Sequence, residues 1–224
     1  LLDLNLAGVP AGTECLDLLT PQYVADLISW GAIGARTTES QLHRELASGL
    51  SCPVGFKNGT DGNLKIAIDA VGAAAHPHHF LTVTKAGYLG IFETTGNEDG
   101  HVILRGGQSP NYDSESVNTA AQMLESAGCS PRLMVDFSHA NSGKQHRGQI
   151  TVGTDVSSQL AQGENRIVGV MIESHIVEGR QDVVAGCDLV YGQSITDACL
   201  GWDDTVQVID QLAAAVDTRR SLSR

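Results

Sequence analysis

The stretch LMVDFSHANS, residues 133–142, carries the strongest indication of the fold. It opens with the apolar run LMV and then places Asp136 and His139 where the strand would end. Parallel strands covered on both faces have such apolar runs, and polar residues at their carboxyl ends point into a site rather than into the core. Because an isolated buried histidine is more often satisfied by a backbone carbonyl, the interpretation of His139 depends on whether this pattern recurs.

Two similar stretches flank this one at equal spacing. HVIL at 101–104 leads into Arg105, and RIVGVMIES at 166–174 is almost wholly apolar until Glu173. Arg105, His139 and Glu173 follow one another at intervals of 34 residues. One unit of a (β/α)8 barrel has roughly 31 residues, and no GxGxxG motif follows a strand, so a barrel is favoured over a doubly wound sheet.

Strands and helices alternate along the rest of the chain, which indicates an α/β fold. Further strands are expected at residues 13–18, 32–36 and 53–57, after a connector over residues 1–13. Helices are expected at residues 20–30, 38–47, 64–75, 113–127, 154–162 and from 203 onward. An eight-stranded barrel is the smallest well-filled closed form of such a sheet. We therefore expect residues 1–224 to form a single partial TIM-barrel domain with six of the eight βα units, the first two barrel strands being missing upstream.

Residues 80–100 depart from this alternation. FLTVT and YLGIFETT are rich in β-branched and aromatic residues, and the second piece ends at the turn GNEDG, residues 96–100. Two such runs joined around Lys85-Ala86-Gly87 predict an inserted β-hairpin.

Composition excludes several classes of protein. The 224 residues carry a formal net charge of −12, which argues against a general nucleic-acid or anionic-membrane surface. No apolar run approaches the roughly 18 residues of a membrane span, and the first residues do not resemble a signal peptide. The five cysteines are scattered and form no CxxC pair, which suits reduced thiols. We expect a soluble cytoplasmic protein.

Three cations occupy predicted strand ends. Arg36, Lys57 and Arg105 each follow or end an apolar run, which is unusual for solvated surface charge in an acidic protein. In one barrel mouth they would repel each other unless an anion joined them, which suggests a ligand with phosphate and carboxylate groups. Pairing of each cation with a structural carboxylate is the alternative.

A second group of strand-end residues offers one nitrogen and two carboxylates. His139, Glu173 and Asp197 suit a divalent metal such as Mn, Fe, Co or Zn and leave positions open for a substrate. On chemistry alone, a general acid–base set or plain structural polar residues explain them at least as well.

Six motifs in this order resemble one known family. They are GARTTESQ (34–41), GFKNGTDG (55–62), ILRGG (103–107), DFSHANS (136–142), GVMIESH (169–175) and SITDAC (194–199). Together they resemble the type I 3-deoxy-D-arabino-heptulosonate 7-phosphate (DAHP) synthases, the microbial group regulated by aromatic amino acids. The resemblance covers nearly the whole chain. It implies a (β/α)8 transferase that condenses phosphoenolpyruvate with erythrose 4-phosphate and releases phosphate, at the entry to the shikimate pathway.

The resemblance also implies roles for individual residues. Those expected to bind phosphoenolpyruvate are Arg36, Lys57 and Arg105, with the backbone amide of Ala35 on its phosphate and Glu14 positioning a nearby water. Those expected to hold the divalent metal ion are His139, Glu173 and Asp197. Lys57 and His139 are the predicted catalytic residues.

Regulation and assembly follow from the same resemblance. Residues 80–100 match the hairpin with which this group binds a feedback-inhibiting aromatic amino acid, and Ser51 is expected near that pocket. A homo-oligomer, either a dimer or a tetramer, is also expected.

The sequence departs from the family at two points. The family's fourth metal ligand is a cysteine on the first barrel strand, and its erythrose-phosphate site uses Lys-Pro-Arg-Thr-Thr after the second. Neither occurs here, and Cys15 and Cys52 do not occupy matching motifs. A catalytically inactive fragment or effector-binding module is therefore one alternative, and a Schiff-base aldolase using Lys57 is another. The octulosonate 8-phosphate synthases share the chemistry but are disfavoured by GARTTES and DFSHANS.

Overall fold

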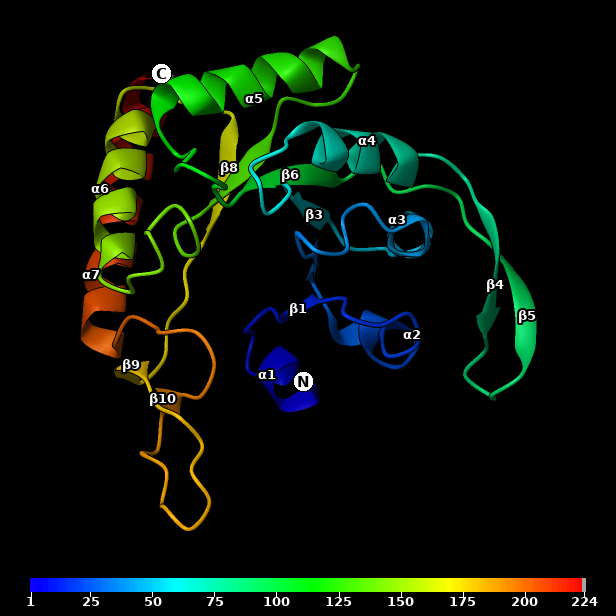
Figure 1. The fold of residues 1–224 in the computed structure, drawn as a ribbon. Helices are drawn as coiled ribbons and strands as arrows, with labels where there is room; N and C mark the ends of the chain where they lie inside the picture. Colours follow the sequence, from blue (N-terminus) through cyan, green and yellow to red (C-terminus); the bar gives the residue numbers. More distant parts are fainter. Residues whose placement is uncertain (223–224) are drawn as a thin grey trace. The chain divides into compact units, whose positions relative to one another are not determined.

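The structure is a computed structural model and describes residues 1–222. The chain forms two compact units, whose helices and strands are drawn in Figure 1. The first unit holds residues 1–103 and 122–131. The second holds residues 104–121 and those from 132 onward. Both units combine helices with parallel strands, so the expected α/β class is confirmed.

Parallel strands form the centre of the first unit. In pairing order they are β1 (Gly12–Glu14), β2 (Trp30–Ile33), β3 (Val54–Lys57) and β6 (Gly100–Leu104). Every residue of β3 is buried, and Val102, Ile103 and Leu104 of β6 are fully excluded from solvent. Burial of both faces of these strands explains why their sequences are continuous apolar runs.

Helices connect these strands. They are α2 (Pro21–Val24) with the 3-10 helix η1 (Ala25–Leu27), α3 (Gln41–Ser48) and α4 (Lys65–Ala74). Ser40 caps α3 by accepting a hydrogen bond from the amide of His43. In α4 the buried residues recur at helical spacing, Ala67, Ile68, Val71 and Ala74 among them, so its apolar stripe packs inward.

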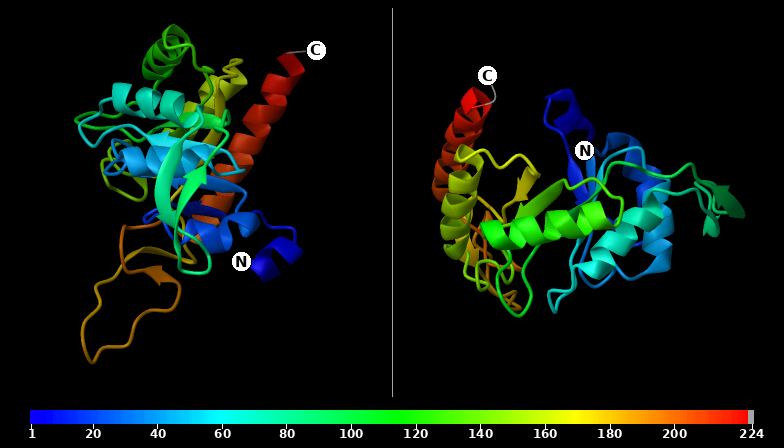
Figure 2. Two further views of the ribbon diagram at one scale, coloured as in Figure 1. Left: turned by 90° about the vertical axis from the view of Figure 1, so that its right-hand side faces the viewer. Right: turned by 90° about the horizontal axis from the view of Figure 1, so that it is seen from above.

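The expected hairpin lies between α4 and β6. Strands β4 (His79–Val83) and β5 (Leu89–Glu93) pair antiparallel, with Phe80 opposite Phe92. Gly87 adopts a φ of 82° in the connecting turn, a conformation that favours glycine. Figures 1 and 2 show the hairpin as an arm that projects from the rest of this unit.

The second unit contains a smaller parallel pair, β7 (Leu133–Asp136) and β8 (Ile167–Met171). Helices α6 (Gly148–Ala161) and α7 (Trp202–Leu222) lie against each other, and α5 (Ser114–Ser126) begins in this unit (Figure 1). Phe137 and Val208 of α7 both pack against Gly153 of α6, since a Cβ at Gly153 would lie 3.1 Å from each side chain. Among residues 1–222, no helix has the length and apolar character that crossing a membrane requires.

The helix expected at residues 20–30 is interrupted. Thr20 makes no capping hydrogen bond, and Val24 leaves the helical conformation with φ −126° and ψ −8°. Only α2 and η1 form before β2 begins at Trp30. The prediction of one continuous helix was wrong, because the backbone departs from helical geometry at the β-branched Val24 and is extended at Ile28.

Three other elements were not predicted. The short helix α1 (Leu2–Leu6) lies in the expected connector, and β9 (Val177–Arg180) pairs with β10 (Gln193–Ser194) in a stretch read as loop. Helix α6 begins at Gly148, six residues before its expected start. Its N-terminal turn has weak helix formers, and burial of Val152 on the packed face compensates for them.

A buried histidine links β2 and β6 across β3. Trp30 Nε1 donates a hydrogen bond to His101 Nε2 at 3.1 Å, and His101 Nδ1 lies 3.2 Å from the carbonyl of Asp99. Gly55 leaves room for this link, because a Cβ there would lie 3.0 Å from His101 Nε2. Since the indole N–H only donates, Nε2 accepts and the ring is neutral. Burial lowers the pKa of His101.

We expect protonation of His101 to destabilise the first unit. An unfolded histidine titrates near about 6.5 and the folded pKa is lower, so the unfolded state binds more protons as the pH falls. The stabilising contribution is complete above that pH and is lost as the pH falls toward the folded-state pKa. The unfolding temperature measured by calorimetry should therefore decrease when the pH is lowered from about 7.5 to about 5.5. His101→Gln should reduce that fall, whereas the exposed control His79→Gln should not; equal slopes in the two variants would contradict the assignment.

Candidate functional site

The turn after β7 carries His139. This residue adopts a φ of 54°, a left-handed conformation that is uncommon outside glycine. Its carbonyl accepts hydrogen bonds from the amide of Lys144 at 2.7 Å and from Ser142 Oγ at 3.3 Å. These bonds hold the turn, so the imidazole projects from a fixed backbone.

A buried carboxylate orients this imidazole. Asp136 is fully excluded from solvent, and its Oδ2 lies 2.9 Å from His139 Nδ1. Ser138 donates to Asp136 Oδ1 from both its amide, at 2.9 Å, and its hydroxyl, at 2.6 Å. The carboxylate therefore keeps the proton of His139 on Nδ1 and leaves Nε2 as an acceptor, the arrangement found behind metal-binding histidines.

Glu173 follows β8 and is held through its backbone. Its amide donates to Gln149 Oε1 at 2.8 Å, and Gln149 Nε2 donates to its carbonyl at 3.0 Å. The amide of Leu200 also donates to this carbonyl, at 2.9 Å. Because Gln149 is buried on α6, the position of Glu173 is fixed by a helix and by a distant part of the chain.

Asp197 lies between β10 and the bridge that pairs Leu200 with Ser174. One ligand atom each of His139, Glu173 and Asp197 lie within 4.8 Å of one another, and His139 Nε2 is 3.8 Å from Glu173 Oε1. The structure therefore brings together all three residues predicted to bind metal. A neutral imidazole beside two carboxylates fits a divalent ion of borderline softness.

Four residues predicted to bind phosphoenolpyruvate lie in the first unit. Lys57 ends β3 and is 8% exposed, whereas Arg36 is exposed in the loop after β2. The hydroxyl of Thr38 donates to the carbonyls of Lys57, at 2.8 Å, and Gly34, at 3.0 Å, and so connects β3 to the loop of Ala35 and Arg36. The carboxylate of Glu14 occupies the space that a Cβ on Gly34 would need.

The fifth such residue, Arg105, belongs to the second unit. It directly follows β6 and is 8% exposed. The next residue, Gly106, adopts a φ of 74°, so the chain turns sharply after the guanidinium-bearing residue.

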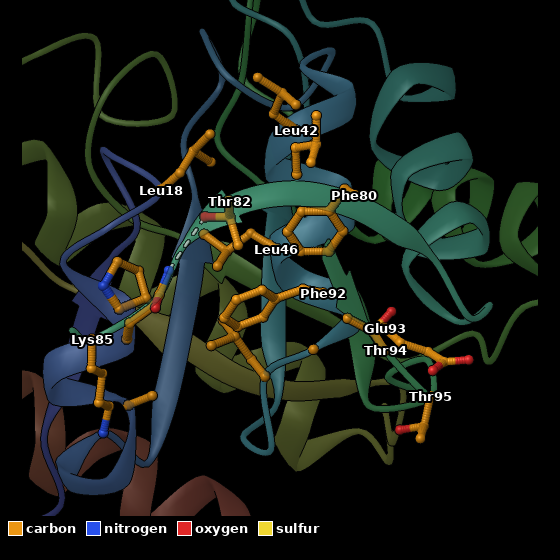
Figure 3. A pocket seen from close by; sticks show the side chains of 16 residues that line it. Leu18, Leu42, Leu46, Phe80, Thr82, Lys85, Phe92, Glu93, Thr94 and Thr95 are labelled. Carbon is orange, nitrogen blue, oxygen red and sulfur yellow. Dashed lines mark hydrogen bonds between the residues drawn. The ribbon is translucent and has the colours of Figure 1, made fainter. Parts of the chain in front are cut away.

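A pocket of about 520 Å³ lies in the first unit, between one face of the hairpin and helices α2 and α3 (Figure 3). Its wall includes Leu42 and Leu46 of α3 and the facing pair Phe80 and Phe92, whose ring centroids are 6.2 Å apart. The full lining is Leu18, Pro21, Gln22, Ala25, Leu42, Leu46, Gly49, Leu50, Phe80, Leu81, Thr82, Lys85, Phe92, Glu93, Thr94 and Thr95. Gln22 Nε2 donates to Thr82 Oγ1 at 3.3 Å, the dashed line in Figure 3. This volume is typical of small-molecule sites.

Ser51 is exposed and does not line this pocket, although its neighbour Leu50 does. Sequence reasoning missed the helical part of the lining. The signal was present: Leu42, Leu46 and Leu50 recur every four residues along and just past an otherwise polar helix.

Comparison with known proteins identifies the family. The DAHP synthetase I family matches residues 4–210. The chain is 60% identical over 220 residues to the Phe-sensitive phospho-2-dehydro-3-deoxyheptonate aldolase of Escherichia coli K12, covering 98% of this chain and 63% of that protein. It is 55% identical over 219 residues to the Trp-sensitive protein of the same strain, with the same two coverages. The chain belongs to the DAHP synthetase I family.

A solved structure agrees with this assignment. The phospho-2-dehydro-3-deoxyheptonate aldolase of Francisella tularensis SCHU S4 is 52% identical and superposes with a TM-score of 0.94, covering 97% of this chain and 63% of that one. The chain thus spans just under two thirds of the length of the proteins it matches.

We expect Asp136→Asn to weaken metal binding at His139. A neutral amide accepts the hydrogen bond from His139 Nδ1 less strongly than a carboxylate does, so Nε2 becomes a weaker metal ligand. Loss of such supporting groups typically lowers metal affinity by about 10- to 100-fold. Calorimetric titration with Mn²⁺ measures the effect. Asp69→Asn, at an exposed position of α4, is the matched control. Unchanged affinity in a folded Asp136→Asn protein would disprove the assigned role.

Proposed function

We propose that this chain carries the catalytic and regulatory residues of a 3-deoxy-7-phosphoheptulonate synthase, a cytoplasmic transferase that condenses phosphoenolpyruvate with erythrose 4-phosphate. We also propose that its strands belong to a single (β/α)8 barrel domain, of which it supplies six units. The observation that carries the proposal is the cluster of His139, Glu173 and Asp197 within 4.8 Å, in a chain of this family.

In this proposal the three cationic side chains bind phosphoenolpyruvate. Arg36, Lys57 and Arg105 are assigned to its carboxylate and phosphate, and the amide of Ala35 to the phosphate. Buried placement favours Lys57 and Arg105 for this role, because ion pairs are stronger where water is excluded. Fixed donors stabilise charge that develops during the reaction without reorganising.

In this proposal the metal site would activate the aldehyde group of erythrose 4-phosphate. His139, Glu173 and Asp197 would hold a divalent ion, which when bound supplies a Lewis acid for the aldehyde oxygen of erythrose 4-phosphate. The cations hold phosphoenolpyruvate while its C2–C3 π electrons form the bond from C3 to the aldehyde carbon, and the aldehyde oxygen takes up a proton to become a hydroxyl. Water, positioned by Glu14, adds at the electron-poor C2 and gives up a proton. The resulting hemiketal phosphate releases inorganic phosphate by cleavage of its C–O bond and leaves a ketone at C2. Orientation of two anionic substrates supplies much of the acceleration.

Chelation should abolish condensation in any preparation with synthase activity. Because the proposed reaction depends on a bound ion, removal of metal should lower the rate by at least about 100-fold, and added Mn²⁺ should restore it. His139→Ala should not recover under the same addition. Full activity after exhaustive dialysis against chelator would overturn the metal role, and borohydride trapping of substrate on Lys57 would favour a Schiff-base aldolase instead.

We propose further that the pocket beside the hairpin binds an aromatic amino acid as an inhibitor. Phe80, Phe92 and the leucines of α3 provide an apolar chamber suited to an aromatic ring. Lys85 and Gln22 add polar groups suited to a carboxylate. The Phe- and Trp-sensitive names of similar proteins support this class of effector without deciding between its members. A homo-oligomer, dimer or tetramer, stays a prediction that light scattering can check.

Neighbouring residues on β5 provide a matched test of the pocket. Phe92 lines it, whereas Ile91 is 74% exposed and is not among its lining residues. Phe92→Ala should weaken phenylalanine or tryptophan binding by about thirtyfold, equivalent to about 2 kcal/mol for the lost apolar contact. Ile91→Ala should leave the affinity close to that of the unmodified chain. Equal effects of the two substitutions in calorimetric titrations would place the effector elsewhere.

A further inference from the structure

A buried asparagine joins two strand ends of the second unit. Asn141 is 4% exposed, and its Nδ2 donates to the carbonyl of Asp136 at 2.7 Å and to that of Leu104 at 3.1 Å. Leu104 directly precedes Arg105, and Asp136 ends the strand that leads to His139. One side-chain amide therefore holds the backbone next to a proposed anion ligand and the backbone next to a proposed metal ligand.

The oxygen of the same amide holds the loop after Arg105. Asn141 Oδ1 accepts from the amide of Asn111 at 2.8 Å, and Asn111 Oδ1 accepts from the amide of Gly106 at 2.7 Å. The two loops are in close contact, because a Cβ on Gly106 would lie 2.8 Å from Ala140 Cβ. Asn141 thus holds the backbone before Arg105 directly, through Leu104, and the backbone after Arg105 indirectly, through Asn111.

We propose that Asn141 is a positioning residue that sets the separation between the Arg105 guanidinium and the His139 imidazole. This rests on the proposed function, which assigns Arg105 to phosphoenolpyruvate and His139 to the metal. A neutral amide can donate two hydrogen bonds and accept one in a single plane, which a hydroxyl or a carboxylate cannot do. Loss of these bonds leaves the fold's strands in place but allows both functional side chains to move.

Removal of Asn141 and removal of Asn111 should have different effects on ligand binding. Asn141 contacts both strand ends, so its removal should weaken binding of anion and metal together. The Asn111 side chain contacts the Arg105 loop through Gly106, and its backbone amide would still bond to Asn141 after truncation. Asn111→Ala should therefore weaken anion binding alone.

The experiment measures two dissociation constants by calorimetry on the full chain, one for Mn²⁺ and one for phosphoenolpyruvate, well below the unfolding temperature. Asn141→Ala and the neutral, near-isosteric Asn141→Leu should each weaken binding of both ligands by about tenfold or more, the scale seen for groups that support metal ligands. Asn111→Ala should weaken binding of phosphoenolpyruvate alone, by a similar factor. Asn118→Ala, at an exposed position of α5 where the side chain accepts from Arg166, is the control and should change neither affinity.

Each outcome decides a separate question. If the Asn141 variants melt at lower temperature but keep both dissociation constants, the asparagine only stabilises the fold and the positioning role is overturned. If Asn141→Ala does not fold, Asn141→Leu decides, because it keeps the side-chain volume and adds no buried charge. If the unmodified chain binds neither Mn²⁺ nor phosphoenolpyruvate, the proposed function itself fails, and the positioning role fails with it.

Discussion

The buried carboxylate of Asp136 is the contact on which the candidate metal site depends. It is fully excluded from solvent and accepts hydrogen bonds from Ser138 and His139, residues that follow it within one turn. A buried charge without such donors is strongly destabilising, so the chain after β7 is confined to a path that supplies them. The left-handed backbone of His139 is part of that path. Residues close to His139 in sequence therefore orient the imidazole.

The other ligands depend on distant parts of the chain. Glu173 is held by Gln149 on the preceding helix and by Leu200, which comes 27 residues later. Neither contact can be recognised in a single sequence, because Gln149 and Leu200 come close to Glu173 only when the chain has folded. This explains why apolar runs sufficed to predict the parallel strands, and why strand ends together with the family resemblance sufficed to predict the grouping of His139, Glu173 and Asp197, whereas the supporting residues were not predicted.

The same distinction applies to the pocket and to the helices. The hairpin was predictable from its own two β-rich runs, but its pocket is completed by side chains of α2 and α3 that carry no mark of a ligand site. Helix α3 also contacts the loop of Ala35 and Arg36, since Arg44 Nε donates to the carbonyl of Thr38 and Thr38 Oγ1 to that of Lys57. The expected helix at residues 20–30 breaks at Val24, a β-branched residue with low helix propensity, and the chain is extended again at Ile28.

The placement of the two tryptophans gives each unit its own optical reporter. Trp30 lies in the first unit against His101, and Trp202 lies in the second, 60% exposed at the start of α7. An indole that donates to an imidazole and one that faces water should emit at different wavelengths and respond differently to soluble quenchers. Intrinsic fluorescence can therefore distinguish unfolding of one unit from unfolding of the other without any added label. Cooperative loss of both signals would indicate that the units unfold together.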